Sequence, residues 1–523
     1  MKIFSYLLLA LAFTASANAQ KKWGEWHQWG QQSDSTFVNP IIPADYSDLD
    51  CIRVGDDYYA ISSTMQFSPG MTLLHSKDLV NWEICTNIVT DLTQIGPELS
   101  WQRMNRQGKG IWAGSLRHHN NRFYLFFGTP NEGYFMTSAP KADGPWEPLT
   151  CLMAEPGWDD CSAAWDEKGN AYFVGTHFAD KYKTYLFDMS PDGKSIDRNS
   201  ARLINEGNRR EANKLIKVGK WWYLVFSEHK GGRYVMAKRA KRLKGPYKEE
   251  RQLALVNREA NEPNQGDIVE GKDGKWYFLT HHGRGDWSGR IASLLPVTWI
   301  DEWPIIGEVV DGKIGRMQWQ GKMPNIEKQQ LRLQRSDDFD HNTLGPQWQW
   351  NYQPRNEMFS LAERQGWMRL KAFRPLETNR LLKAGNTLTQ RTFRTTDNCV
   401  TIKIDISNMA DGQRAGLCHF STESSGIGIT QEKGRRYIEY HIGKESMRGQ
   451  PLNQQYIWLQ SRWGIDGIST YSYSLDGDHF MPFGQSYQMR WGHYRGDRIG
   501  IYSFNNLSDS GYIDIDYLHY TME

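Results

Sequence analysis

The sequence has little cysteine, and its cysteines form no recognisable framework. Six are scattered over 523 residues, and no two stand at the CxxC spacing. A chain of this length can bury a large core without disulfides, so we expect small buried residues at these positions. Cys399 and Cys418 lie in one predicted domain and could pair.

Two further shortages narrow the class of protein. The 62 basic residues nearly balance the 60 acidic ones, which leaves a net charge of +2 and no basic footprint for nucleic acid. Long hydrophobic runs are missing except at the N-terminus, where Ile3 to Phe13 follows Met1-Lys2 and precedes Ala17-Asn18-Ala19. This pattern predicts a secretory signal over residues 1–19. Because no cysteine follows the cleavage site directly, we expect a secreted, periplasmic protein without a lipid anchor or membrane partner.

Aromatic residues, in contrast, are abundant. They make up 13% of the chain, which contains 22 tryptophans. Flat apolar rings suit a protein that stacks against sugar rings, and they are equally expected in the interior of a β-rich fold. Composition leaves both interpretations open.

One repeat organises residues 20–325. Five times the chain gives a turn, an aromatic pair and a short apolar strand, about every 50 to 65 residues, with very little helical period between them. The repeats begin at Gly55, Asn121, Gly169, Gly219 and Gly274. This spacing is typical of propeller blades and predicts a five-bladed β-propeller, with a β-sandwich pair as the alternative.

The pattern changes after the propeller segment. Residues 326–523 show alternating strands, such as Val400–Ile406 and Tyr512–Tyr517, and hairpin turns such as Asp476-Gly477. We therefore predict an all-β chain with a signal peptide over residues 1–19, a propeller over 20–325 and a β-sandwich over 326–523.

Three acidic residues hold equivalent positions in three of the repeats. Asp48, Asp160 and Glu211 each stand just before a strand, about nine to twelve residues ahead of the aromatic pair of their repeat. Equivalent blade positions face the same axis, so we expect the three carboxyls to converge. Glycosidic hydrolysis needs one acid and one base, and a third carboxylate can raise the pKa of the acid. Asp159 competes with Asp160, and turn capping is the alternative role for each acid.

Several motifs resemble those of family 43 glycoside hydrolases. They are Asn39-Pro-Ile-Ile, Ser47-Asp48, Ile52 to Tyr59, Trp112-Ala113, Asp160-Cys-Ser and Gly289-Arg290. Asp338-Phe339-Asp340 resembles the opening of the concanavalin-like sandwich, a jelly roll, that is often appended to these enzymes. The resemblance covers nearly the whole mature chain and implies an inverting glycosidase of the β-xylosidase and α-L-arabinofuranosidase group.

The resemblance also assigns roles to single residues. Asp48 matches the general base, Glu211 the general acid, and Asp160 the acid that tunes and orients the proton donor. Arg290 matches an arginine that reaches the substrate. Trp112 and Phe67 are further candidates that could stack on a sugar, with burial in the core as the alternative. Inversion predicts that the carboxyls of Asp48 and Glu211 lie about 6.5–9.5 Å apart.

Two departures from the family pattern bear on the substrate. Leu49 follows Asp48 where proline is frequent, and Ala212-Asn213 follows Glu211 where Gly-Pro is frequent. These variants resemble the arabinofuranosidase-rich branch, so we favour release of terminal α-L-arabinofuranose from hemicellulose oligosaccharides, with β-D-xyloside as the alternative. A sandwich that closes one side of the pocket would make the enzyme exo-acting.

No cofactor is required for such hydrolysis, and we assign no metal ligands. The sequence leaves two roles for His281-His282, binding of Ca²⁺ near the propeller axis or hydrogen bonding without a metal. The second is an alternative because Ca²⁺ prefers oxygen ligands. We expect a monomer whose partner is an oligosaccharide with a terminal pentose. A non-catalytic carbohydrate-binding propeller would keep the aromatics but lose an acid, and an adhesion protein would show more tandem domains.

Overall fold

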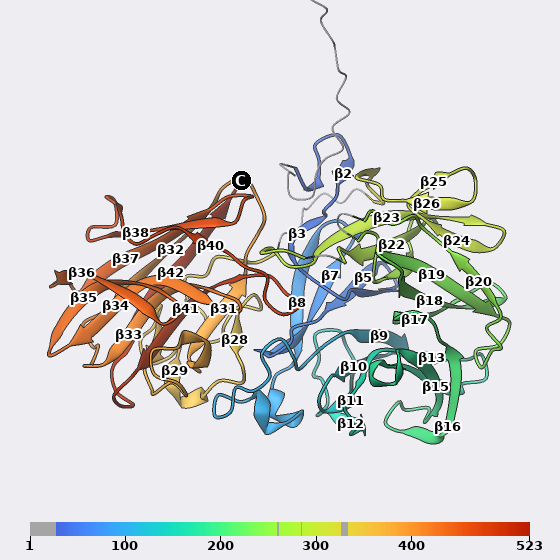
Figure 1. Cartoon of the computed structure of the whole chain (residues 1–523), viewed down its shortest axis with the longest axis horizontal. Coiled ribbons are helices and arrows are strands. Elements are labelled where there is room, and N and C mark those ends of the chain that lie inside the picture. Colours follow the sequence, from blue (N-terminus) through green and yellow to red (C-terminus); the bar gives the residue numbers. More distant parts are fainter. Residues whose placement is uncertain (1–27, 259–260, 284, 326–332) are drawn as a thin grey trace, which may run out of the picture.

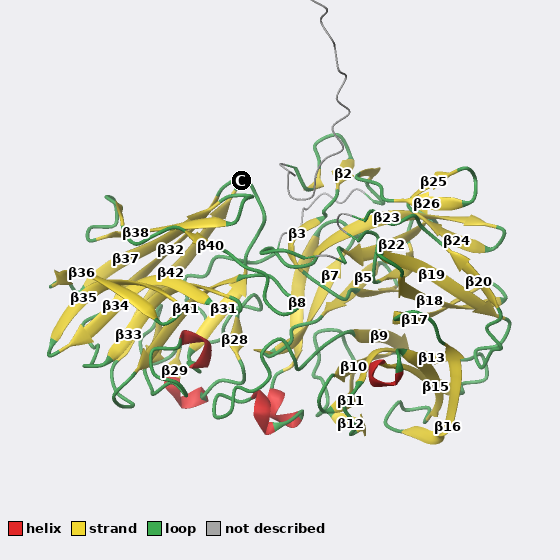
Figure 2. Ribbon diagram, viewed as in Figure 1, coloured by secondary structure: helices red, strands yellow, loops and turns green. Residues whose placement is uncertain are grey.

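The computed structural model describes residues 28–258, 261–283, 285–325 and 333–523, and its regular structure is almost entirely β-strand (Figures 1 and 2). Its short 3₁₀ helices are η1 (Leu92–Gln94), η2 (Pro97–Leu99), η3 (Phe178–Asp180), η4 (Asn356–Met358) and η5 (Leu381–Lys383). Within these described ranges no helical segment has the length and apolarity that a bilayer crossing demands. The predicted signal peptide lies outside the described residues.

Five antiparallel sheets follow one another along the first part of the chain, on the right in Figure 1. The first contains β4 (Asp50–Val54), β5 (Asp57–Ser62), β7 (Gly70–Ser76) and β8 (Trp82–Val89). The second contains β9 (Gly114–His119), β10 (Arg122–Thr129), β11 (Gly133–Ala139) and β12 (Thr150–Met153). The third contains β13 (Trp158–Trp165), β14 (Ala171–His177), β15 (Lys183–Met189) and β16 (Ile196–Asn205). The fourth contains β17 (Glu211–Val218), β18 (Trp221–His229), β19 (Arg233–Ala240) and β20 (Glu249–Gln252).

The fifth sheet joins the two ends of this region. It contains β21 (Gly266–Glu270), β22 (Trp276–His281), β23 (Ile291–Ile300) and β24 (Trp303–Ile306), and β3 (Ile42–Asp45) pairs with β23. Because β3 precedes the first sheet in the chain, this pairing ties the first and last sheets together. Short strands complete the region: β1 (Gly30–Gln31), β2 (Thr36–Val38), β25 (Glu308–Val310), β26 (Ile314–Arg316) and β27 (Gln320–Lys322).

The five repeats seen in the sequence form the first hairpin of each sheet. Each hairpin turns at a residue with a positive φ, and these turn residues are Gly55, Asn121, Gly169, Gly219 and Gly274. Glycine adopts this left-handed conformation at no steric cost, and asparagine tolerates it better than most residues. Aromatic residues of these hairpins then pack between neighbouring sheets, as Tyr223 of β18 and Phe278 of β22 do in one apolar cluster.

The second region is a two-sheet sandwich, on the left in Figure 1. One sheet has the strand order β36-β35-β34-β33-β41-β31-β28-β6, and the other β29-β30-β42-β32-β37-β38-β39, with β40 also on β38. The strands of the first are β28 (Gln349–Asn351), β31 (Thr387–Arg391), β33 (Gln413–Phe420), β34 (Ser424–Glu432), β35 (Arg435–Ile442), β36 (Glu445–Leu452) and β41 (Arg498–Asn505), joined by β6 (Phe67–Ser68). Those of the second are β29 (Phe359–Ser360), β30 (Met368–Lys371), β32 (Asn398–Asp405), β37 (Tyr456–Trp463), β38 (Ile468–Ser474), β39 (Met481–Pro482), β40 (Tyr487–Gln488) and β42 (Tyr512–Met522).

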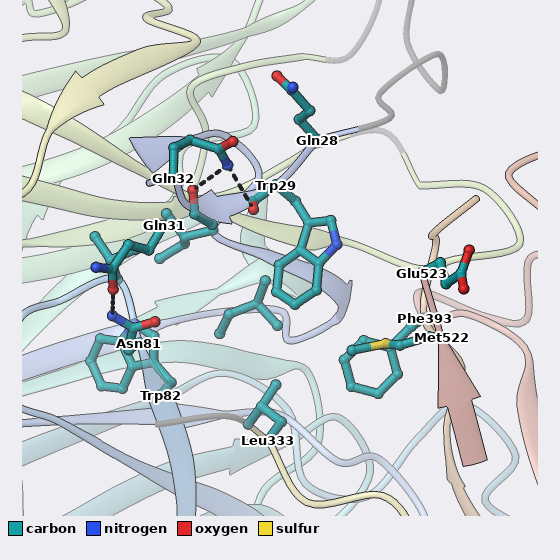
Figure 3. Close-up of a pocket in the computed structure, with 14 residues that line it drawn as sticks. Gln28, Trp29, Gln31, Gln32, Asn81, Trp82, Leu333, Phe393, Met522 and Glu523 are labelled. Atoms are coloured by element: carbon teal, nitrogen blue, oxygen red, sulfur yellow. Dashed lines mark hydrogen bonds between the residues drawn. The ribbon is translucent and has the colours of Figure 1, made fainter. Parts of the chain in front are cut away.

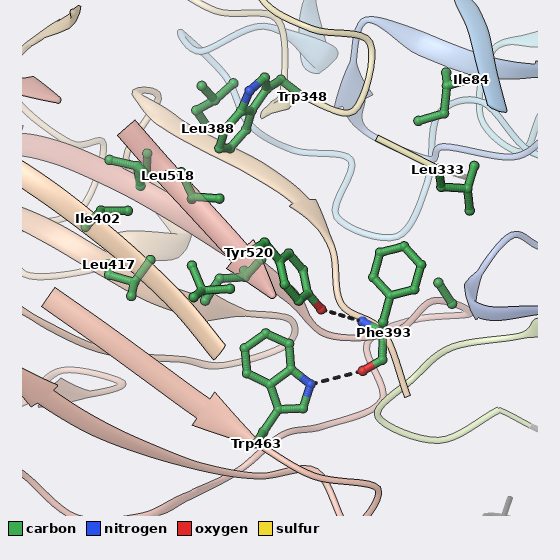
Figure 4. Packing of buried hydrophobic residues seen from close by; sticks show 14 of the residues in the cluster. Ile84, Leu333, Trp348, Leu388, Phe393, Ile402, Leu417, Trp463, Leu518 and Tyr520 are labelled. Atoms are coloured by element: carbon green, nitrogen blue, oxygen red, sulfur yellow. Dashed lines mark hydrogen bonds between the residues drawn. The ribbon is translucent and has the colours of Figure 1, made fainter. Parts of the chain in front are cut away.

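One apolar cluster fills the sandwich and extends into the propeller region (Figure 4). It includes Ile402 and Leu417 of the two facing sheets and reaches Ile84 of β8. Phe393 is held at its edge, because its N–H donates to Tyr520 Oη (2.9 Å) and its carbonyl accepts from Trp463 Nε1 (3.1 Å). The two regions therefore share buried surface.

The predicted fold class, a propeller followed by a sandwich, is confirmed. All six cysteines are free. The suggested Cys399–Cys418 pair is wrong, because both thiols are free: Cys418 is buried on β33, whereas the half-buried Cys399 thiol on β32 lies beside Thr401 Oγ1.

Candidate active site

Four carboxyl groups surround one cavity of about 270 Å³ in the propeller region. They belong to Asp48, Asp159, Asp160 and Glu211. The same cavity is lined by the arginines Arg209, Arg233 and Arg290 and by the aromatic residues Trp112, Phe178, Tyr182 and Tyr494. The predicted acids are thus brought together from the segment between β3 and β4 and from two different sheets.

An unusual backbone conformation accompanies each predicted acid. Asp48 and Asp160 have φ values of 58° and 47°, and Ala212, next to Glu211, has 65°. The register of β13 against β14 shifts between Asp159 and Ser162, and that of β17 against β18 shifts after Glu211. Such bulges bend a strand and redirect its side chains, and left-handed non-glycine residues cost about 1–3 kcal/mol each. The fold thus accepts local strain where the carboxyls enter the cavity.

Asp48 is held from two sides. Its N–H donates to Nδ1 of His281 (2.7 Å), and Nη2 of Arg290 donates to its Oδ2 (3.0 Å). Burial by itself would raise the pKa of Asp48, but the charge of Arg290 is the main influence that brings that pKa below its ordinary value. An ionised carboxylate inside the cavity has the charge state that a general base needs.

Asp160 fixes the backbone beside Glu211. Its Oδ2 accepts from the N–H of Ala212 (2.8 Å), and its Oδ1 accepts from Nε2 of Gln265 (3.0 Å). Burial and the charge of Glu211 raise the pKa of Asp160 to about 7. Asp160 is therefore placed to orient Glu211 and to interact with its charge.

Glu211 opens β17 and faces an arginine. Nη2 of Arg233 lies 2.5 Å from Oε1 of Glu211, and 24% of the Glu211 side chain is exposed. Burial raises the pKa of Glu211 above its ordinary value, although Arg233, Arg209 and Arg290 act in the opposite direction. A carboxyl that keeps its proton to a higher pH is suited to act as a general acid.

The sandwich contributes one wall of the cavity. Nε of Arg290 donates to the carbonyl of Tyr494 (3.1 Å), and the rings of Tyr494 and Trp112 meet edge to face with centroids 5.8 Å apart. Asp45 joins the two regions beside them, because it accepts from the N–H groups of Arg290 and Gly496 (both 3.1 Å). Arg290 and Trp112 therefore lie in the cavity, as the sequence predicts.

Phe67 does not lie there, and its prediction as a sugar-binding residue is wrong. Its ring is completely buried, packs against Phe420, and lies between the guanidinium groups of Arg495 and Arg498, which are 4.5 and 3.8 Å from its centroid. The cause is the pairing of β6 with β28, which makes Phe67 part of the sandwich.

His281 and His282, the residues at which Ca²⁺ stays a prediction, are buried and each contacts a neighbouring acidic residue. Since Nδ1 of His281 accepts a hydrogen bond from Asp48, the neutral ring carries its proton on Nε2, and burial lowers its pKa to about 3. His282 contacts the buried carboxyl of Glu262. Across the described ranges, no three His, Cys, Asp or Glu side chains gather as metal ligands. The geometry matches the hydrogen-bonded histidine.

A cluster of buried charged side chains lies near the acids of the cavity. Asp50 contacts Nη1 of Arg117 (2.9 Å) and Nζ of Lys214 (2.7 Å), and Asp267 lies 3.6 Å from the same Nη1 of Arg117. These four residues come from four different sheets. Burial and Asp50 raise the pKa of Asp267 to about 7, and the charge of Lys214 acts to lower the pKa of Asp48. The cluster joins β17, which carries Glu211, to β4, which begins just after Asp48.

A second cavity, of about 320 Å³, lies where the start of the described chain meets its C-terminus (Figure 3). Trp29, Trp82, Phe393 and Met522 line it, and among the described residues that line it Glu523 is the single acidic side chain. With no second carboxyl it lacks the pair that glycosidic hydrolysis requires. The chemistry is therefore assigned to the first cavity.

Sequence reasoning missed several cavity residues. They are Arg209, Arg233, Gln265, Phe178, Tyr182 and Tyr494. Arg233 follows the Gly231-Gly232 turn far from Glu211 in the sequence, and the sheet order β17-β18-β19 brings the two side chains together. Tyr494 carries no local signal, because only the packing of the two regions brings it to the cavity.

Comparison with known proteins agrees with this geometry. Residues 37–304 match the model of "Glycosyl hydrolases family 43", and residues 336–521 match that of the "Beta xylosidase C-terminal Concanavalin A-like domain". The chain belongs to glycoside hydrolase family 43. It is therefore a glycoside hydrolase, and the predicted family resemblance is confirmed.

Relatives within family 43 carry two substrate names. A β-xylosidase of Formosa agariphila is 32% identical over 94% of this chain and 91% of its own length. A non-reducing-end α-L-arabinofuranosidase of Bacteroides ovatus is 29% identical over 66% of this chain and 67% of its own. Among solved structures, a bifunctional GH43-CE protein of Bacteroides eggerthii superposes with a TM-score of 0.82 at 28% identity, covering 95% of this chain. This chain spans 64% of that longer protein.

Proposed function

We propose that this family 43 enzyme is an exo-acting, inverting hydrolase that removes a terminal pentose from hemicellulose oligosaccharides. Asp48 acts as the general base, Glu211 as the general acid, and Asp160 orients and tunes Glu211. The observation that carries the proposal is that the pKa values of two carboxyls in one cavity are shifted in opposite directions. The pKa of Asp48 is lowered beside Arg290, whereas burial raises the pKa of Glu211.

The chemical step follows from these charge states. Ionised Asp48 takes a proton from a water molecule as its oxygen attacks the anomeric carbon. Protonated Glu211 gives its proton to the glycosidic oxygen as the bond to the leaving group breaks. The Asp160 hydrogen bond to the Ala212 N–H keeps Glu211 directed at that oxygen. Inversion predicts a separation of about 6.5–9.5 Å between the carboxyls of Asp48 and Glu211.

The cavity also bears on exo action. Its volume of about 270 Å³ is small, and Tyr494 of the sandwich closes one side beside Trp112. A cavity of this size suits a single sugar ring better than the middle of a long chain. No cofactor takes part in these steps, and Ca²⁺ has no role in them.

The substrate choice takes its support from the relatives. The β-xylosidase of Formosa agariphila matches nearly the whole chain, and so does a putative β-xylosidase of Xylanibacter ruminicola, at 31% identity over 90% of this chain. We therefore place β-D-xyloside first and α-L-arabinofuranoside, favoured by Leu49 and Ala212-Asn213, second. We further propose a periplasmic monomer that acts on free oligosaccharides.

The test is release of p-nitrophenol from the β-D-xyloside and the α-L-arabinofuranoside, side by side. The chain should cleave at least one of them, and Glu211→Ala should lower kcat by about 10³-fold, which is typical for loss of a general acid. Preference for the arabinofuranoside would make it the first-ranked substrate in place of the xyloside. The proposed roles of Asp48, Asp160 and Glu211 would be unchanged. Binding of both sugars without cleavage would instead indicate a carbohydrate-binding propeller and contradict the proposal.

A further inference from the structure

Asp159 has no part in the mechanism, yet it faces the same cavity as Asp160. Consecutive residues of a regular strand point to opposite faces of the sheet. Here the register of β13 shifts between Asp159 and Ser162, and Asp160 has a φ of 47°. The bulge therefore directs two consecutive carboxyls into one cavity.

The surroundings of Asp159 are built to hold it. The hydroxyl of Tyr134 donates to its carbonyl (2.6 Å). Gly128 makes room beside it, because a Cβ at Gly128 would lie 3.0 Å from Oδ1 and 3.1 Å from Cα of Asp159. Oδ1 of Asp159 is buried and has no hydrogen-bond partner among the described residues. Buried polar atoms normally have partners, so this carboxyl has bonding capacity to spare.

Burial and the neighbouring acidic groups favour the neutral form of the Asp159 carboxyl. Burial first, and then the charge of Asp160, raise the pKa of Asp159 well above its ordinary value. Two of the cavity arginines are engaged elsewhere, Arg233 by Glu211 and Arg290 by Asp48. A neutral carboxyl can donate one hydrogen bond and accept others, and a sugar hydroxyl can do the same.

We propose that Asp159 is a specificity-determining residue whose carboxyl hydrogen-bonds a hydroxyl group of the sugar bound in the catalytic cavity. This inference rests on the proposed function and adds a selectivity to it. A neutral sugar fits beside Asp159. A sugar that carries this hydroxyl is favoured over its deoxy analogue, which would leave the buried carboxyl without a partner.

The experiment measures binding separately from turnover. In a Glu211→Gln background, the Kd values of the p-nitrophenyl β-D-xyloside and α-L-arabinofuranoside are measured by titration calorimetry. Asp159→Leu removes the hydrogen bond at similar size and should raise Kd about five- to tenfold, the usual worth of one such bond. Asp159→Asn keeps a neutral donor and should stay within about twofold. Glu167→Gln, exposed on the same sheet, is the control and should leave Kd unchanged.

A second series identifies the hydroxyl and covers the case in which Asp159→Leu does not fold. Monodeoxy analogues of the better ligand are titrated with the Glu211→Gln chain and with its Asp159→Asn and Asp159→Leu forms. One deoxy analogue should bind the Glu211→Gln chain more weakly than the parent glycoside does. The added Asp159→Leu substitution should not weaken the binding of this analogue any further. In turnover by the otherwise unchanged enzyme, Asp159→Leu should raise KM and keep kcat within about threefold.

Three results would overturn the inference. One is an unchanged Kd in Asp159→Leu, and another is an Asp159→Asn form as impaired as the leucine form. The third is failure of the Glu211→Gln chain to bind either glycoside. These outcomes are distinct from failure of the proposed function, which is read from turnover by the unsubstituted chain.

Discussion

The propeller and the sandwich both bury charged side chains, but their central cores differ. Below the acids, the propeller encloses Asp50, Arg117, Lys214 and Asp267, all charged in ordinary peptides. The sandwich encloses aliphatic side chains such as Ile402, Leu417, Ile427, Ile457 and Leu459, all completely buried. Buried charges are costly unless paired, whereas aliphatic burial is directly stabilising. The propeller therefore carries the reactive groups, and the sandwich contributes stability and one wall of the cavity.

The largest effect on stability is expected from the ion cluster. Lys214→Met leaves Asp50 with Arg117 alone and removes a cation from beside the acids, so the free energy of unfolding should fall by about 3–5 kcal/mol. Denaturant titration measures this. Lys217→Met, on the same strand but paired with the exposed Glu167, should change stability by less than about 1 kcal/mol. Equal effects of the two substitutions would mean that the buried ion cluster stabilises the fold no more than an exposed ion pair does.

The sandwich core should lose stability without losing catalysis. Ile402→Ala creates a cavity between the sheets and should cost about 2–4 kcal/mol. The kcat/KM of the folded enzyme at low temperature should stay within about twofold, because Ile402 is far from the reacting groups in the fold. Thr401→Ala, its neighbour on the same strand, is the control. A tenfold loss of kcat/KM in Ile402→Ala would contradict the division of roles.

The wall formed by Tyr494 should affect binding more than chemistry. Tyr494→Ala removes the ring that meets Trp112 but keeps the carbonyl that holds Arg290, so KM should rise about fivefold while kcat changes little. The melting temperature should not move, because the side chain is 56% exposed. Leu507→Ala, another exposed sandwich residue, should change neither quantity. An unaltered KM in Tyr494→Ala would mean that this wall of the sandwich does not contribute to substrate binding.

The smallest effect is a shift in pH dependence. Glu211 is active when protonated, so activity declines as pH rises through its pKa. The positive charge of Arg233 favours ionised Glu211 and lowers that pKa, so Arg233→Leu should move the alkaline limb of kcat/KM upward by about one pH unit. Arg242→Leu, exposed just beyond the same strand, should not move it. A downward shift would contradict the assignment of Glu211 as the acid.

Much of this architecture is predictable because its signals are local. A turn residue that tolerates a positive φ, followed by an aromatic pair, marks the first hairpin of each of the five propeller sheets. Positions near the start of three of these hairpins hold the acids. Tyr494 and Phe67 show where local signals end. Tyr494 reaches Arg290 across 204 residues of chain, and Phe67 leaves the propeller through the pairing of β6 with β28. Both depend on how the two regions pack, which neither local sequence records.

The central claim is that Asp48 and Glu211 carry out hydrolysis with inversion. The most direct test is proton NMR of the first sugar released from the cleaved p-nitrophenyl glycoside, recorded before mutarotation. With the β-D-xyloside, the account predicts that the α-anomer of xylose appears first. Initial appearance of the β-anomer would mean retention, and would contradict the assignment of Asp48 as a base acting on water.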